Sequence, residues 1–125
     1  MVQTMRQPDE IDLETYELAR QWWRTISEYT DNFFETTARF EAGLASHEIE
    51  GMLLDLEMAM NSVLETPFPL SVNPARRSLL EAMASVLHGF SATLNGKDKM
   101  ASNYLGVARR HLTTFYTDLD EMGLA

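Results

Sequence analysis

The histidines and the lack of cysteine limit the catalytic chemistry that this chain can perform. None of His47, His88 and His111 has a glutamate three residues before it, and no two of them lie within one helical turn. The di-iron pattern of helical bundles and the H-E-x-x-H zinc pattern are therefore absent. The sequence also has no cysteine, no G-x-S-x-G and no glycine-rich phosphate loop. It favours a non-enzymatic protein and predicts no cofactor.

Acidic side chains come closest to a metal-binding pattern. Glu48 and Asp55, like Glu50 and Glu57, are seven residues apart, which places each pair on one face of an expected helix. This arrangement is similar to that of the all-α nucleotide pyrophosphohydrolases, which bind magnesium through acids on adjacent helices. The next expected helix supplies only Glu81. A Mg²⁺- or Mn²⁺-dependent hydrolase of that type is thus an alternative function, with the four acids as its metal ligands.

Gly89 lies in a row of small residues on the third expected helix. A glycine inside a helix costs roughly 1 kcal/mol relative to alanine, which close approach of another helix could offset. The missing side chains could instead leave a pocket beside the fourth expected helix. The sequence therefore leaves a small-molecule site open, with Ser85, His88, Gly89 and His111 as its candidate residues.

The first expected helix holds seven of the twelve aromatic residues, more than one apolar stripe requires. Contact with several neighbouring helices, a second chain, or a ligand or lipid groove could each explain this excess. Because large exposed apolar areas generally mark interfaces, we expect a homodimer. Its anchors would be the adjacent aromatic pairs and a tyrosine one or two turns earlier. These candidates are Tyr16, Trp22, Trp23, Phe33 and Phe34.

Besides Lys97 and Lys99, the concentrated positive charge of the sequence is in two arginine pairs, Arg76-Arg77 and Arg109-Arg110. The first pair lies in the first turn of an expected helix, where the helix dipole disfavours a cation. A carboxylate or phosphate partner would offset that cost, so both pairs are candidates for a polar hot spot. Together with the acids, they would orient a bound partner.

Charge is distributed unevenly along the chain. Residues 1–65 carry 14 acids and 4 bases, residues 66–125 carry 5 acids and 6 bases, and the whole chain has a net charge of −9. This balance argues against nucleic acid and anionic membranes as partners. The chain lacks a bilayer-length apolar run, and residues 1–10 lack a signal-peptide core. We therefore expect a cytoplasmic protein with a second copy as partner and another protein as a further candidate.

Apolar residues recur at spacings of three and four along almost the whole chain, which predicts helices over 9–42, 46–66, 74–94 and 98–122. The fourth stretch has the most regular pattern, with spacings of 4, 3, 4, 3, 4 and 3. At 34 residues the first helix would be about 51 Å long, against roughly 30–38 Å for the others. It must therefore bend, protrude or contact something else.

Local signals set the expected helix ends. Asp9, Asn73 and Asp98 are predicted N-caps, and Gly43 and Gly96 are predicted to end the first and third helices. The short turn at Gly96 predicts that the third and fourth helices form an antiparallel hairpin.

These patterns predict an all-α four-helix bundle with a long first helix. Residues 1–8 would form a flexible tail, and residues 9–125 would form one domain. The predicted function is a non-enzymatic protein–protein interaction, in an adaptor, assembly or regulatory role. The hydrolase and the small-molecule binder are the alternatives.

Overall fold

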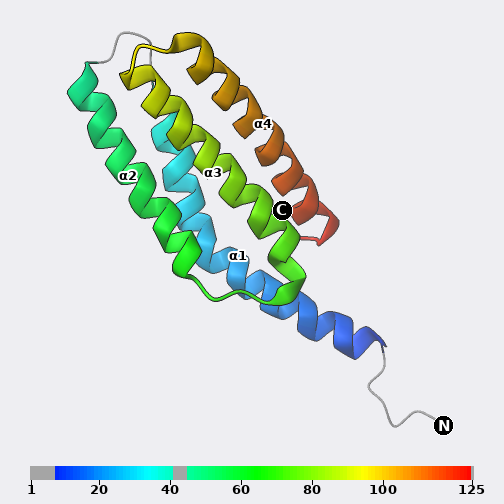
Figure 1. Cartoon of the computed structure of the whole chain (residues 1–125). Coiled ribbons are helices and arrows are strands. Elements are labelled where there is room, and N and C mark those ends of the chain that lie inside the picture. Colours follow the sequence, from blue (N-terminus) through cyan, green and yellow to red (C-terminus); the bar gives the residue numbers. More distant parts are fainter. Residues whose placement is uncertain (1–7, 41–44, 125) are drawn as a thin grey trace, which may run out of the picture.

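A computed structural model describes residues 8–40 and 45–124, with side chains placed from Leu13 onward. The predicted all-α bundle is confirmed, since four long helices and no strand occur within these ranges (Figure 1). A short 3₁₀ turn, η1, interrupts the connector between the second and third helices. The elements are α1 (Pro8–Ala38), α2 (Ser46–Glu65), η1 (Leu70–Val72), α3 (Asn73–Leu94) and α4 (Asp98–Glu121).

The α3–α4 hairpin is the most closely packed helix pair, and it confirms the predicted antiparallel arrangement. Gly96 ends α3 with a φ of 72°, the left-handed conformation that glycine adopts most easily. The Gly96 N–H donates to the Thr93 carbonyl at 3.0 Å, and the Lys97 N–H donates to the Ala92 carbonyl at 2.9 Å. These two bonds form a Schellman motif that reverses the chain within a few residues.

The three predicted N-caps lie inside their helices rather than before them. Asp9 follows Pro8, the first residue of α1, and Asp98 is itself the first residue of α4. Asn73 is helical because η1 leads directly into α3 and already brings Val72 to a φ of −94° and a ψ of −1°. The predicted cap Gly43 lies outside the described residues.

Helix α1 is the longest element, and it ends four residues earlier than predicted. Its 31 residues correspond to about 46 Å. The last turn tightens, because the Arg39 N–H is shared between the Glu35 and Thr36 carbonyls, both at 3.2 Å. The N-terminal end of α1 extends beyond the other three helices, as the predicted length difference requires (Figure 1).

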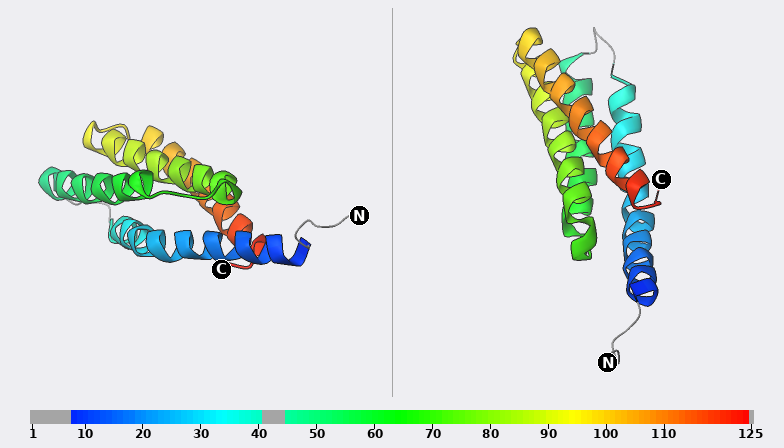
Figure 2. Two further views of the ribbon diagram at one scale, coloured as in Figure 1. Left: turned by 90° about the horizontal axis from the view of Figure 1, so that it is seen from below. Right: turned by 90° about the vertical axis from the view of Figure 1, so that its right-hand side faces the viewer.

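One hydrophobic core connects all four helices. Helix α1 packs against α2, and α2 packs against α3, whereas α4 lies mainly on α3. In both views of Figure 2, α4 runs obliquely, so that its first turns lie beside α3 and its last turns approach α1. The largest side chains with full burial are Ile26, Phe33, Leu56, Leu79, Met83, Phe90, Phe115 and Leu119.

Candidate binding groove

The aromatic residues of α1 point to several neighbours rather than to one outer surface. Trp22 and Phe33 are 3% and 0% exposed, so the protomer itself encloses them, contrary to the expectation that they face a second chain. Trp23 is half-buried, and its ring lies edge-on to that of Phe115 on α4, with centroids 5.7 Å apart. Phe34 is also half-buried, beside Phe33. The wide aromatic face of α1 therefore serves mainly to fill the space toward the other helices of the same chain.

The projecting part of α1 keeps apolar side chains in solvent. Leu13 is 64% exposed, Leu18 is 47% exposed, and Tyr16 is 36% exposed. Glu14 and Glu17 are exposed on the same segment. Of the five aromatic interface candidates, Tyr16 is thus the one that is exposed, at the N-terminal end of α1.

Because α4 runs obliquely, a groove is open between α1 and α4. At one end the Trp23 and Phe115 rings bridge the two helices. Toward the C-terminal end of α1 and the N-terminal half of α4, the helices diverge (Figure 2). The resulting groove has a volume of about 360 Å³. Its lining residues come from α1, from the segment just after α1, and from α3 and α4, and are Phe34, Thr37, Ala38, Phe40, Val86, Phe90, Leu105, Ala108, Arg109 and Leu112.

The inner part of this groove is apolar and well packed. The Phe40 and Phe90 rings lie 4.8 Å apart between centroids, and Val86 and Ala108 are 2% and 4% exposed. Arg109 adds the one cationic side chain of the lining and is exposed. No ion pair or hydrogen bond joins its guanidinium to the described part of the chain. An apolar recess with few polar groups is the usual form of a small-molecule site.

The four candidate arginines lie in different environments. The Arg76 guanidinium lies 4.0 Å from the centroid of the Phe68 ring, and its Nη2 donates to the Leu64 carbonyl at 3.3 Å. Arg76 therefore joins the start of α3 to the C-terminal end of α2, whose unpaired carbonyls favour a cation. Arg77 and Arg110 are exposed, and Arg110 does not line the groove, although its neighbour Arg109 does.

The predicted pocket between α3 and α4 does not assemble from its four candidate residues. Gly89 is buried, and a methyl group added there would lie 3.2 Å from the Leu105 side chain, which occupies the space. His88 is exposed beside the Tyr104 ring at 5.3 Å.

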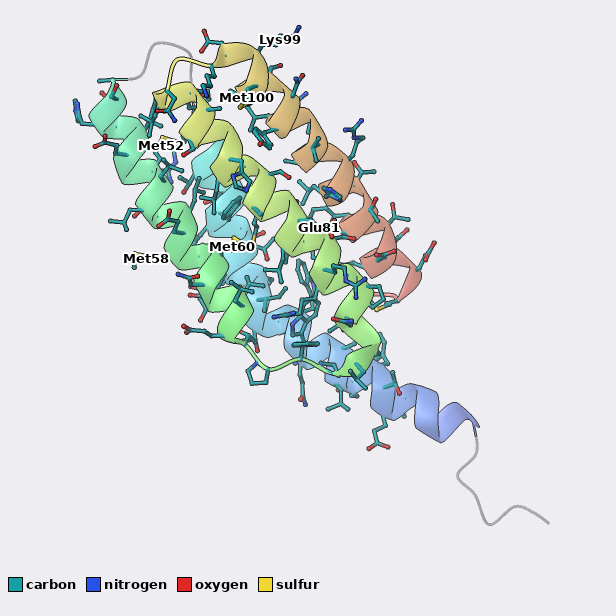
Figure 3. All side chains as sticks on the ribbon, in the orientation of Figure 1. Met52, Met58, Met60, Glu81, Lys99 and Met100 are labelled. Carbon is teal, nitrogen blue, oxygen red and sulfur yellow. The ribbon has the colours of Figure 1, made fainter. Side chains whose placement is uncertain are left out.

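His111 instead lies 3.1 Å from the Glu81 carboxylate, which Figure 3 places between α3 and α4. The two histidines therefore have different partners at different levels of the hairpin. Ser85 is half-buried in α3.

The acids proposed as metal ligands are spread over the solvent side of α2. Glu48, Glu50, Asp55 and Glu57 are all exposed. Within residues 8–40 and 45–124, no three His, Asp or Glu side chains converge in a way that could hold a metal ion. The described structure therefore gives no support to the hydrolase alternative.

The groove between α1 and α4 is the feature that the sequence patterns do not locate. Its position follows from the angle between two helices that are distant in sequence, and no local spacing encodes that angle. The small residues Thr37, Ala38 and Ala108, which line the groove on α1 and α4, are the indication of it that the sequence contains.

Comparison with known proteins identifies no relative of this chain. No protein-family model matches it, and neither a curated protein nor a solved structure is significantly similar to it. Within the described residues, no helix has the length and apolar character needed to cross a membrane.

Proposed function

We propose that this chain is a non-enzymatic binding protein and that its binding surface is the groove between α1 and α4. The observation that carries this proposal is the apolar recess of about 360 Å³ formed jointly by α1, α3 and α4. Its volume lies within the roughly 300–1,000 Å³ typical of ligand sites. The absence of converging acids in the described residues supports a binding role rather than metal-dependent catalysis.

A neutral amphiphile tests this proposal without involving charge. Titration with 1-decanol is expected to shift the amide NMR signals of residues 34–40 and 105–112, because these segments line the groove. An Ala38→Trp variant should abolish these shifts by filling the groove, and it should still fold because Ala38 is exposed. Ala45→Trp alters another exposed alanine, outside the lining, and is the matched control. Shifts that survive in Ala38→Trp would contradict the proposed site.

Self-association is a second candidate function, favoured by the exposed Leu13, Tyr16 and Leu18 on the projecting end of α1. Residues 9–20 carry five acids and one base, Arg20, which lies 3.6 Å from Glu17, so two such ends facing each other would repel. In a dimer, this segment of one copy would therefore contact a different surface of the second copy. The exposed arginine pair of α4 has the complementary charge.

A further inference from the structure

We infer that the groove between α1 and α4 binds a medium-chain amphipathic carboxylate, with its carboxylate on Arg109 and its alkyl chain in the apolar recess. This inference rests on the proposed binding function and specifies the chemical class of the ligand.

The size of the groove, about 360 Å³, suits a small molecule. At about 30 Å³ per non-hydrogen atom, by analogy with liquid water, the same volume holds roughly twelve such atoms. Decanoate, with ten carbons and two oxygens, has this size.

The apolar part of the lining favours an alkyl chain. Phe34, Phe40 and Leu112 are half-buried and keep part of their surface open to the recess. The hydroxyl of Thr37 donates to the Phe33 carbonyl at 2.9 Å, so its proton is already used within α1. No other polar side chain in the lining offers a donor apart from Arg109. Transfer of a chain of methylene groups from water into the recess is therefore favourable, and it leaves no hydrogen-bond donor of the lining apart from Arg109 without a partner.

The cation in the lining favours an anionic head group. Arg109 is exposed, and no ion pair or hydrogen bond joins its guanidinium to the described residues, so this group is available to a ligand. A guanidinium can donate two parallel hydrogen bonds to a carboxylate. Although the whole chain has a net charge of −9, residues 66–125, which supply α3 and α4, have six bases and five acids. The α3 and α4 walls of the groove are therefore close to electrically neutral.

Calorimetric titration with decanoate, below its micelle concentration, tests the inference on the full chain. Decanoate is expected to bind more tightly than 1-decanol. Arg109→Gln should weaken decanoate binding about tenfold, because it removes a charge-assisted hydrogen bond, and it should weaken binding of the uncharged 1-decanol much less. Arg110→Gln removes the same charge one residue away, outside the lining, and should change the affinity less than twofold. Ala38→Trp should abolish binding of both compounds.

Each other outcome overturns a defined part of this account. Equal affinities for decanoate and 1-decanol that do not change in Arg109→Gln would disprove the carboxylate inference and leave the groove as a binding site. Failure of both compounds to bind would disprove the inference together with the proposed function. Decanoate binding that persists in Ala38→Trp would place the ligand elsewhere. If the protein forms a dimer that the Ala38→Trp substitution dissociates but decanoate does not dissociate, the occupant of the groove is a second copy of the chain.

Discussion

Arg76 shows at the scale of a single residue why an arginine can occupy the unfavourable first turn of a helix. It stacks on Phe68 and donates to the Leu64 carbonyl, so it links α3 to the end of α2. We expect Arg76→Gln to lower the free energy of unfolding by about 1–2 kcal/mol, through loss of the cation–π contact and of a charged hydrogen bond. Urea denaturation measures this change.

Arg77 provides the matched control for this prediction, since it is exposed and adjacent. Arg77→Gln should alter the free energy of unfolding by less than about 0.5 kcal/mol. Equal effects of the two substitutions would show that the contacts of Arg76 do not contribute.

Tyr116 should make stability depend on pH in the alkaline range. Burial, and secondly the nearby Asp31 carboxylate, raise the pKa of Tyr116 above its ordinary value of 10.0. The folded protein therefore holds this proton more tightly than the unfolded chain does. The resulting stabilisation is fully present below pH 10 and is lost as the pH rises through the higher pKa of the folded state.

Ultraviolet titration at the tyrosinate absorbance tests this expectation. The difference between the wild type and Tyr116→Phe should have a midpoint above pH 10, and Asp31→Asn should lower that midpoint. Tyr104→Phe controls for the loss of one phenol. A midpoint at or below pH 10 in the wild-type difference would contradict the assignment.

Among the elements, α4 contains a glycine that its packing does not require. A methyl group added at Gly106 would have no neighbour within 4 Å, whereas one added at Gly89 on α3 would meet Leu105 at 3.2 Å. Gly106→Ala should therefore raise the free energy of unfolding by about 0.5–1 kcal/mol, through helix propensity alone. Thermal and urea denaturation measure the gain.

Gly96→Ala is the contrasting substitution in the same hairpin. Because Gly96 has a φ of 72°, alanine should cost about 1–2 kcal/mol there. A stabilising Gly96→Ala, or a destabilising Gly106→Ala, would contradict the described turn and packing.

Local sequence signals predict most element boundaries in this protein. The apolar stripes, the proline-containing connector and Gly96 fix α2, α3 and α4 to within about one residue of their observed ends. The end of α1 at Ala38 was not predicted, because its apolar stripe continues past that residue. Gly123, with a φ of 74°, ends α4 in the same left-handed way as Gly96 ends α3, and sequence analysis did not identify it.

The candidate site was predicted less well than the fold, for a physical reason. The aromatic excess of α1 correctly indicated more than one contact face. It could not distinguish a second chain from the α4 of the same chain, because helix periodicity does not specify the neighbour. The choice depends on how α4 crosses from α3 to α1, which long-range packing decides.

At the scale of the whole molecule, self-association through the projecting end of α1 can be tested by substitution. Sedimentation equilibrium of a Leu13→Ser, Leu18→Ser variant should show loss of a dimer present in the wild type, because both side chains are exposed apolar contacts. Added salt should also weaken the dimer, since acids and arginines would orient it.

Leu54 and Met58 on α2 supply the control, since they are 59% and 61% exposed, and Figure 3 shows Met58 on the outer side of its helix. Their replacement by serine should leave the dimer intact. A wild-type chain that stays monomeric at tens of micromolar would remove this candidate function.

The groove between α1 and α4 is the feature on which the proposed function depends. Nuclear Overhauser measurements with ¹³C-labelled decanoate test it most directly, because they report which side chains touch the ligand. We expect contacts from the alkyl chain to Phe34, Phe40 and Leu112, and from the carbon next to the carboxylate to Arg109. Ligand contacts confined to other surfaces would contradict this account. Direct contacts between Ala38 and Leu105, which would mean that the groove is closed, together with no contact to the ligand, would also contradict it.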